Sequence, residues 1–248
     1  MNHPHGSFCF AELHTPQVDL AKRIYHDVFG WDAVDVPASP GYSLFQLNGN
    51  AIVGLRRTDG PHRWVPYIAV DSVDRMAARA ENAGGTVETA PFDTPGVART
   101  CVIQDPDGGL FGLWEYRGRT GADVQNDIAT MWWVELLARD VKAARAFYAG
   151  LFGWPFEETL KFSQIPYTVF RIGEEFVAGA SQYDPEWGMT QSWRVLFAID
   201  DWDATIARLV KSGSEVVFWR DVPHAGRFGI IRDPECADFC VMKPLPRS

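Results

Sequence analysis

The stretch Ile24–Trp31 reads IYHDVFGW, and a related stretch, Phe147–Trp154, reads FYAGLFGW. The second copy begins 123 residues after the first in a chain of 248 residues, so the two copies lie half a chain apart. Self-similarity at a fixed spacing is the sequence signature of a repeated structural unit. The chain is therefore predicted to contain two versions of one domain, each of ordinary size.

Each copy of this stretch ends an amphipathic helix. Apolar residues recur at intervals of three and four over Val18–Val28, and Gly30 suits the left-handed position that follows many helices. Thr15 is expected to cap this first helix. A strand precedes the helix and three strands follow it, and the same order begins again at the strand Trp64–Val70. The pattern predicts β-α-β-β-β units.

Two such units fill each half of the chain, so four are expected in all. The first repeat is predicted to span residues 1–117 and the second residues 128–248, with a polar linker at 118–127. A turn that begins with Asp-Pro precedes the last strand of each repeat, at Asp105 and at Asp233. The expected fold class is α+β, with two tandem domains built from mixed sheets.

Composition and charge narrow the functional classes. The formal net charge of -9 disfavours nucleic acid as a partner, because such binding depends on Lys and Arg meeting phosphates. No apolar run is long enough to span a membrane, and the N-terminal residues do not resemble a signal peptide. Four scattered cysteines without CxxC spacing favour reduced thiols, and hence a cytoplasmic protein.

The helix ending in FY-x3-FGW, the Asp-Pro turn and the run Leu110–Trp114 (LFGLW) resemble the vicinal oxygen chelate superfamily. This superfamily includes glyoxalase I, bleomycin-resistance proteins and extradiol dioxygenases, and the closer likeness is to two-domain glyoxalase-like proteins of actinobacteria. The resemblance implies cup-shaped sheets with a site inside each cup. It implies little about activity, because one fold hosts many functions.

Metal-dependent members of that superfamily place ligands on the first, fifth and last strands of a domain. Counting from the repeated tyrosines and Asp-Pro turns finds the corresponding residues in this chain. They are Phe10, Val65 and Gly112 in the first repeat, and Trp133, Arg194 and Cys240 in the second. Only Cys240 among these can ligate a metal, so no metal or other cofactor is predicted.

Two glutamates occupy the same position in the two repeats, Glu12 and Glu135, on strand faces that should be enclosed. They are the candidate catalytic residues or polar anchors, with a pKa raised by apolar walls; a purely structural role is the alternative. His14 shares a face with Glu12, and the two could hold a displaced divalent metal. Arg194 is expected near Glu135, either as a structural ion pair or as a clamp for an anionic group.

Aromatic residues on inner strands suggest an apolar pocket. The predicted ligand-binding residues are Phe10, His14, Tyr67, Trp114, Tyr116, Trp133 and Arg194.

Three functions stay open on these grounds. The first is metal-independent binding of a small aromatic or hydrophobic molecule. The second is a glyoxalase-like lyase or dioxygenase-type oxidoreductase with a metal near Glu12 and His14. The third is a duplicated scaffold whose cups are filled by their own side chains. A monomeric pseudo-dimer or a homodimer is expected.

Overall fold

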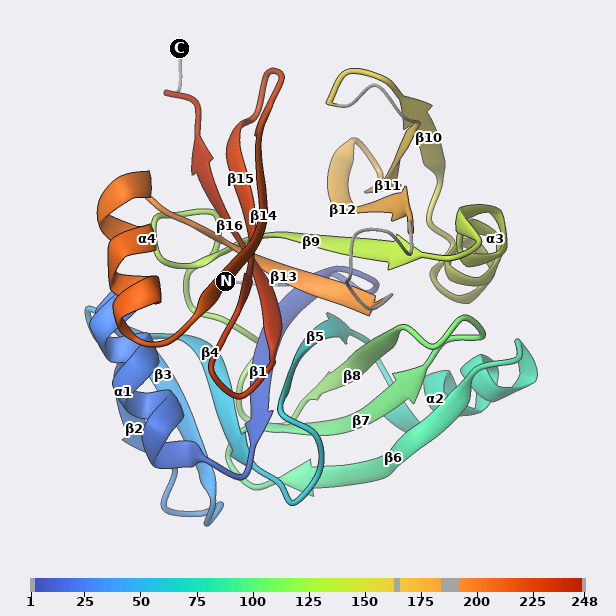
Figure 1. The fold of residues 1–248 in the computed structure, drawn as a ribbon. Helices are drawn as coiled ribbons and strands as arrows, with labels where there is room; N and C mark the ends of the chain where they lie inside the picture. Colours follow the sequence, from blue (N-terminus) through green and yellow to red (C-terminus); the bar gives the residue numbers. More distant parts are fainter. Residues whose placement is uncertain (1–2, 163–165, 184–191, 247–248) are drawn as a thin grey trace. The chain divides into compact units, whose positions relative to one another are not determined.

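The computed structural model describes residues 3–162, 166–183 and 192–246 of the chain. They form two eight-stranded mixed sheets and four helices (Figure 1). The α+β class and the two tandem domains expected from the sequence are confirmed. Among the described residues, no helix combines the length and hydropathy that a membrane span requires.

The first sheet is built from the first repeat, in the order β2-β3-β4-β1-β5-β8-β7-β6. The pairs β1–β4 and β5–β8 are parallel, and the hairpin neighbours are antiparallel. Its strands are β1 (Phe8–Thr15), β2 (Asp32–Asp35), β3 (Tyr42–Leu47), β4 (Asn50–Arg57), β5 (Arg63–Ala69), β6 (Thr86–Thr94), β7 (Ala98–Gln104) and β8 (Leu110–Tyr116).

The second sheet repeats this order as β10-β11-β12-β9-β13-β16-β15-β14. The parallel pairs are β9–β12 and β13–β16, as in the first sheet. Its strands are β9 (Met131–Ala138), β10 (Phe156–Thr159), β11 (Tyr167–Ile172), β12 (Glu175–Gln182), β13 (Ser192–Ala198), β14 (Glu215–Val222), β15 (Gly226–Arg232) and β16 (Asp238–Pro244).

The four helices are α1 (Val18–Phe29), α2 (Val73–Asn82), α3 (Val141–Phe152) and α4 (Trp202–Lys211). Gly30 follows α1 in the left-handed conformation, with φ 74°, as predicted. The predicted cap at Thr15 is wrong. Its hydroxyl accepts a hydrogen bond from Gln17 N at 2.9 Å, so it forms a turn before the helix, and Gln17 occupies the cap position without a side-chain bond.

The chain forms two compact units whose boundaries differ from those of the two sequence repeats. Unit 1 comprises residues 1–9, 65–121 and 133–194, and unit 2 comprises residues 10–64, 122–132 and 195–248. Within unit 2, α1 and α4 lie side by side, and Arg208 Nε donates to Val28 O at 3.0 Å (Figure 1). Within unit 1, α2 and α3 are neighbours, and Arg79 donates to Gly150 O. Each unit therefore draws on both repeats.

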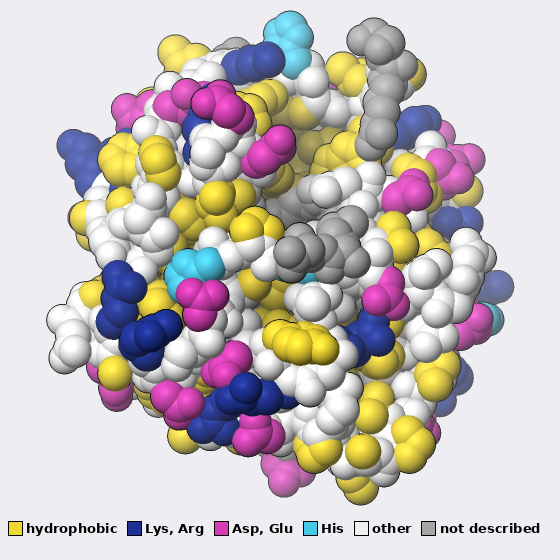
Figure 2. All heavy atoms as spheres, turned by 180° about the vertical axis from the view of Figure 1, so that it is seen from behind, with side chains coloured by type: hydrophobic (Ala, Val, Ile, Leu, Met, Phe, Trp, Pro, Cys, Tyr) yellow, Lys and Arg dark blue, Asp and Glu magenta, His cyan; other side chains and the backbone are white. Residues whose placement is uncertain are grey.

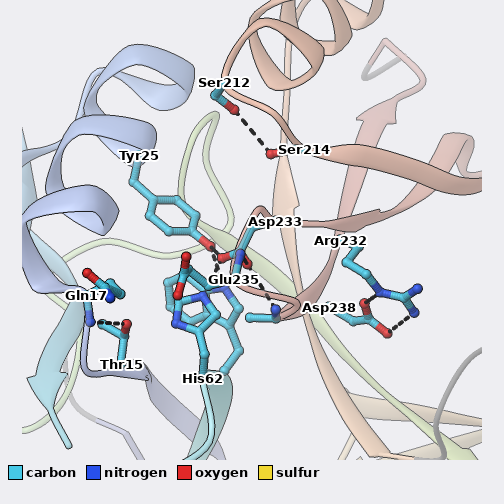
Figure 3. Close-up of polar contacts among 12 residues, drawn as sticks. Thr15, Gln17, Tyr25, His62, Ser212, Ser214, Arg232, Asp233, Glu235 and Asp238 are labelled. Atoms are coloured by element: carbon cyan, nitrogen blue, oxygen red, sulfur yellow. Dashed lines mark hydrogen bonds and ion pairs between the residues drawn. The ribbon is translucent and has the colours of Figure 1, made fainter.

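The repeated tyrosine explains part of this exchange in unit 2. The buried Tyr25 hydroxyl donates to Asp233 Oδ2 at 2.9 Å and accepts from Trp64 Nε1 at 3.0 Å. His62 Nε2 lies 2.7 Å from the same Asp233 oxygen, and Figure 3 shows Tyr25 and His62 converging on Asp233. A side chain of the first repeat is thus tied to the Asp-Pro turn of the second.

Unit 1 contains the matching arrangement with the repeats exchanged. The Tyr148 hydroxyl donates to Asp105 Oδ2 at 2.7 Å and accepts from Trp193 Nε1 at 2.7 Å. Burial raises the pKa of Tyr148 well above its ordinary value and also raises the pKa of Asp105. The phenol therefore stays protonated and can keep donating to the turn.

The tryptophans of the repeated stretch also reach the other repeat. Trp31 Nε1 donates to Ala129 O at 2.8 Å in unit 2, and Trp154 Nε1 donates to Gly6 O at 3.0 Å in unit 1. Both indoles are almost fully buried and stack on the repeated tyrosines. The repeated FGW stretch, which identifies the duplication, thus also provides hydrogen bonds between the two repeats.

Cys236 adopts a left-handed backbone conformation, and the equivalent residue in the first repeat is a glycine. It is exposed and has φ 72°, whereas the Asp105 turn has Gly108 at the same place, with φ 100°. Left-handed backbone is costly for residues that carry a Cβ. Cys236→Gly is expected to raise the free energy of unfolding by about 1 kcal/mol. Thermal or denaturant unfolding measures this change, and Gly108→Ala should give the opposite sign.

Candidate functional site

Glu12 lies on β1, surrounded by basic side chains rather than by apolar walls alone. Arg56 on β4 donates through Nε to Oε2 at 3.0 Å and through Nη2 to Oε1 at 3.1 Å, and His14 Nε2 lies 3.1 Å from Oε2. The Arg56 guanidinium also stacks over the Tyr42 ring at 4.6 Å. The Glu12 side chain is fully buried, and together with Arg56 and His14 it forms a compact polar cluster that contains an ion pair.

The expected rise in the pKa of Glu12 is wrong. Burial alone would raise this pKa, but the charge of Arg56 and the hydrogen bonds from His14 and Arg56 outweigh burial and hold it well below its usual range. Glu12 is therefore a carboxylate at neutral pH and a poor proton acceptor. This argues against a general-base role for Glu12.

A metal does not fit the residues around Glu12. Both carboxylate oxygens face a guanidinium, which repels a cation and occupies the positions that ligation would need. Within residues 3–162, 166–183 and 192–246, no three His, Cys, Asp or Glu side chains are grouped so as to hold a metal ion. The displaced-metal hypothesis for Glu12 and His14 thus lacks a third ligand and an open carboxylate.

The side chains at the positions that the superfamily uses for metal supply one possible ligand, Cys240. All six residues lie in strands, and the matched pairs Tyr67↔Gly112 and Leu196↔Cys240 give both sheets one register, which supports the counting between repeats. The residues are Phe10, Val65, Gly112, Trp133, Arg194 and Cys240. Five of them are chemically unable or ill-suited to bind a divalent cation.

Glu135 has a different environment from that of Glu12. It lies opposite Gly179 in the parallel register of β9 and β12, as Glu12 lies opposite Gly54. The same register puts Ser181 where the first repeat has Arg56, and Ser181 Oγ donates to Glu135 Oε1 at 3.2 Å. Glu135 is half-buried rather than fully buried. At this register position the second repeat thus has a hydroxyl where the first has a guanidinium.

Trp133 and Tyr167 flank Glu135 within unit 1. Trp133 Nε1 donates to the Tyr167 hydroxyl at 3.0 Å, and both rings are half-buried. A Cβ at Gly179 would overlap the Tyr167 hydroxyl, so this glycine allows the ring to cross the strand. In the first repeat the equivalent Phe10 and Tyr42 are almost fully buried. The second repeat therefore leaves aromatic surface accessible beside a carboxylate.

The other predicted ligand residues separate into buried and exposed groups. Tyr67 and Trp114 are fully buried and pack edge to face at 5.7 Å, whereas Tyr116 is 62% exposed. Arg194 is buried on β13 in the same unit as Glu135. Tyr67 and Trp114 are thus core residues, and Tyr116 lies at a strand end.

Arg56 and Ser181 are the site residues that sequence analysis missed. Each lies two residues beyond the glycine that faces the glutamate, on a strand parallel to it. The glycine that recurs at the same place in both repeats, Gly54 and Gly179, was the sequence signal that could have identified them.

On the described part of the face in Figure 2, acidic and basic side chains are interspersed, with no continuous basic surface.

Comparison with known families gives a match in each half of the chain. Residues 10–113 match the model of the glyoxalase/bleomycin resistance protein/dioxygenase superfamily, and residues 133–242 match the glyoxalase-like domain. These ranges lie within the two predicted repeats, whose exact bounds stay predictions.

Similar proteins align along almost the whole chain. A putative glyoxylase CFP32 of Mycobacterium tuberculosis is 34% identical, with 98% of this chain and 97% of that protein covered. The anthracycline biosynthesis protein DnrV of Streptomyces peucetius is 33% identical, with 96% and 93% covered.

Solved structures share the fold at low identity. A Mn(II)-bound glyoxalase from Novosphingobium aromaticivorans has a TM-score of 0.64 and 19% identity, covering 97% of this chain and 84% of that one. The 2,3-dioxygenase LapB from Pseudomonas sp. KL28 has a TM-score of 0.65 and 12% identity, covering 98% and 95%. The two family models and the relatives above 30% identity show that the chain belongs to the glyoxalase/bleomycin resistance protein/dioxygenase superfamily.

Proposed function

We propose that this protein binds a small aromatic or hydrophobic molecule in its second repeat, without the metal that many superfamily members use. Trp133 and Tyr167 supply the aromatic surface, and Glu135 supplies a polar anchor that accepts a hydrogen bond from the ligand. Glu12 and its neighbours serve a structural role in the first repeat.

The contrast between the two glutamates carries this proposal. Glu12 is fully buried and its oxygens are engaged by Arg56 and His14. Glu135, at the same place in the fold, is half-buried and hydrogen-bonded to the neutral Ser181. A carboxylate that keeps some exposure beside accessible rings is suited to a ligand, whereas a saturated ion pair is suited to packing.

The relatives support the class of ligand. DnrV is named for anthracycline biosynthesis, and anthracyclines are fused aromatic molecules, so the name of this relative favours an aromatic ligand. The name of CFP32 points instead to glyoxalase-type chemistry. The aromatic surface of the second repeat favours the first of these. A metal-dependent lyase or oxygenase centred on Glu12 and His14 is disfavoured because Arg56 occupies the carboxylate.

Glu135→Gln is expected to weaken binding of a hydroxylated anthraquinone by about tenfold, the loss that follows from one charged hydrogen bond. Tyr167→Phe is expected to weaken it by about threefold, because it removes the hydroxyl that accepts from Trp133 Nε1 and holds that ring in place. The probe is 1,2-dihydroxyanthraquinone, titrated against tryptophan fluorescence. Tyr42→Phe is the matched control in the first repeat and should leave the affinity unchanged.

Two outcomes would contradict the proposal. Equal losses from Tyr42→Phe and Tyr167→Phe would remove the distinction between repeats. Stoichiometric Zn, Mn, Fe or Ni in the purified protein, by metal analysis, would contradict the metal-free site.

A further inference from the structure

A separate cavity of about 370 Å³ opens at the carboxyl ends of β5 and β8, within unit 1. Its volume lies within the range of small-molecule sites. The side chains that line it and matter here come from three segments: His5 before β1, Asp71 after β5, and Glu115, Tyr116 and Arg117 at the end of β8. None of these residues belongs to the site around Glu135.

The charges in this cavity favour a cation. Glu115 is buried, accepts a hydrogen bond from Val73 N at 2.9 Å and pairs with Arg117, so the guanidinium is offset by its neighbour. Asp71 remains largely exposed, and its partner His5 carries a charge only when protonated. With neutral histidines, two carboxylates face one guanidinium, which leaves a net negative lining.

Tyr116 gives the cavity an aromatic wall. The residue is 62% exposed, and within the described residues its ring makes no stacking contact or side-chain hydrogen bond. The face of such a ring attracts ammonium groups, and a nearby carboxylate adds a separate Coulomb attraction. Asp71 lines the same cavity and supplies that carboxylate.

The fold does not require the side chains of His5, Glu115 or Tyr116, as the second repeat shows. The strand pairing places Lys243 and Pro244 on β16 where β8 has Glu115 and Tyr116. Trp31 and Trp154 bond to Ala129 and Gly6, which aligns Ile128 with His5. At these positions the second repeat has no counterpart of the Glu115 carboxylate, the aromatic ring or the imidazole, although the pairing of β13 with β16 places Asp200 where the first repeat has Asp71. The combination of two carboxylates, an aromatic ring and an imidazole at these strand ends is specific to the first repeat.

We infer that this cavity binds a small organic cation, an ammonium group attached to a flat apolar part. The ammonium lies between the Asp71 carboxylate and the face of Tyr116, and the apolar part lies in the cavity. This site is independent of the ligand site in the second repeat, so either can fail without the other.

Benzyltrimethylammonium tests the inference in the whole protein by isothermal titration calorimetry at low salt. We expect saturable binding that is about fivefold weaker in Tyr116→Leu and in Asp71→Asn, the size of one cation–π or one exposed ionic contact. Phe176→Leu removes another exposed ring and should leave binding unchanged. Benzyl alcohol and benzenesulfonate are the neutral and anionic comparisons, and both should bind more weakly than the cation.

Several results would overturn the inference. One is that the cation shows no saturable binding. Another is that benzenesulfonate or benzyl alcohol binds as tightly as the cation or more tightly. The third is that the affinity for the cation is unchanged in both Tyr116→Leu and Asp71→Asn. Because both substituted residues are exposed, the variants are expected to fold, and their unfolding curves check this.

Discussion

Glu12→Gln is expected to lower the free energy of unfolding by about 3 kcal/mol, because it leaves the charge of Arg56 without its partner in a buried site. The two Arg56 hydrogen bonds at 3.0 and 3.1 Å and the contact with His14 all end on this carboxylate. Denaturant unfolding of the variant measures the loss. The matched change in the second repeat, Glu135→Gln, should cost about 1 kcal/mol or less, because Glu135 is half-buried and bonded to a hydroxyl.

A double-mutant cycle with Arg56→Met separates the pair from its surroundings. The double variant should lose clearly less than the sum of the single losses, since removing both charges leaves none unpaired. Additive losses, or a Glu12→Gln variant as stable as the parent protein, would contradict the ion-pair description.

Acid titration provides a second test of this pair. The pKa of Glu12 is lower in the folded protein than the ordinary value of 4.5. The stability that Glu12 contributes is therefore fully present above that ordinary pKa and is lost as the pH falls below it. Glu12→Gln should lose less stability between neutral and acid pH than the parent protein, and parallel pH profiles would be the contrary result.

Cutting the chain between Gly121 and Ala122 is expected to abolish folding of each half as a monomer, while mixing residues 1–121 with 122–248 should restore it. Unit 2 needs segments from both halves, and its aromatic core joins Tyr25 and Trp31 to Phe239. Each large apolar side chain returned to water costs about 1.5–3 kcal/mol. A few such losses equal the whole stability of a typical domain, about 5–15 kcal/mol.

Circular dichroism and analytical ultracentrifugation of the halves, alone and mixed, measure this dependence. Tyr25→Phe in the first half should weaken the reconstituted complex, because it leaves Asp233 and Trp64 without their shared hydroxyl. A half that folds as a stable monomer with cooperative unfolding would contradict the prediction.

The repeats and all four helices could be predicted from the sequence, because a helix depends on residues that are close together in the chain. Its apolar residues recur every three to four positions, and a glycine follows its last turn. The strands β10, β14 and β15 were expected from the repeat, but their bounds were not predicted. β14 is mostly exposed and mixes Glu215, Arg220 and Asp221 with apolar residues, so it lacks the alternation that identifies a half-buried strand. β14 is a strand because it pairs with β15, and its own sequence pattern does not indicate this.

The site was less predictable, for a related reason. Glu12 and His14 could be placed on one face from alternation alone, but Arg56 reaches Glu12 only because β4 lies parallel to β1. Without that partner, burial was the only visible influence on the Glu12 pKa, and the predicted direction was wrong. The aromatic residues were located in strands correctly, but only the structure distinguishes the buried Trp114 from the exposed Tyr116.

The bond between Tyr25 and Asp233 spans 208 residues of sequence, whereas the matching bond between Asp105 and Tyr148 spans 43. At a synthesis rate of about 5–20 residues per second, the Asp105 bond can form about 2–9 seconds after its first partner is made, and the Tyr25 bond only after about 10–40 seconds. On the ribosome, unit 1 is therefore complete once Arg194 has emerged, while the aromatic face of α1 must wait for the end of the chain. During that interval the apolar face of α1 has no partner from the second repeat to cover it.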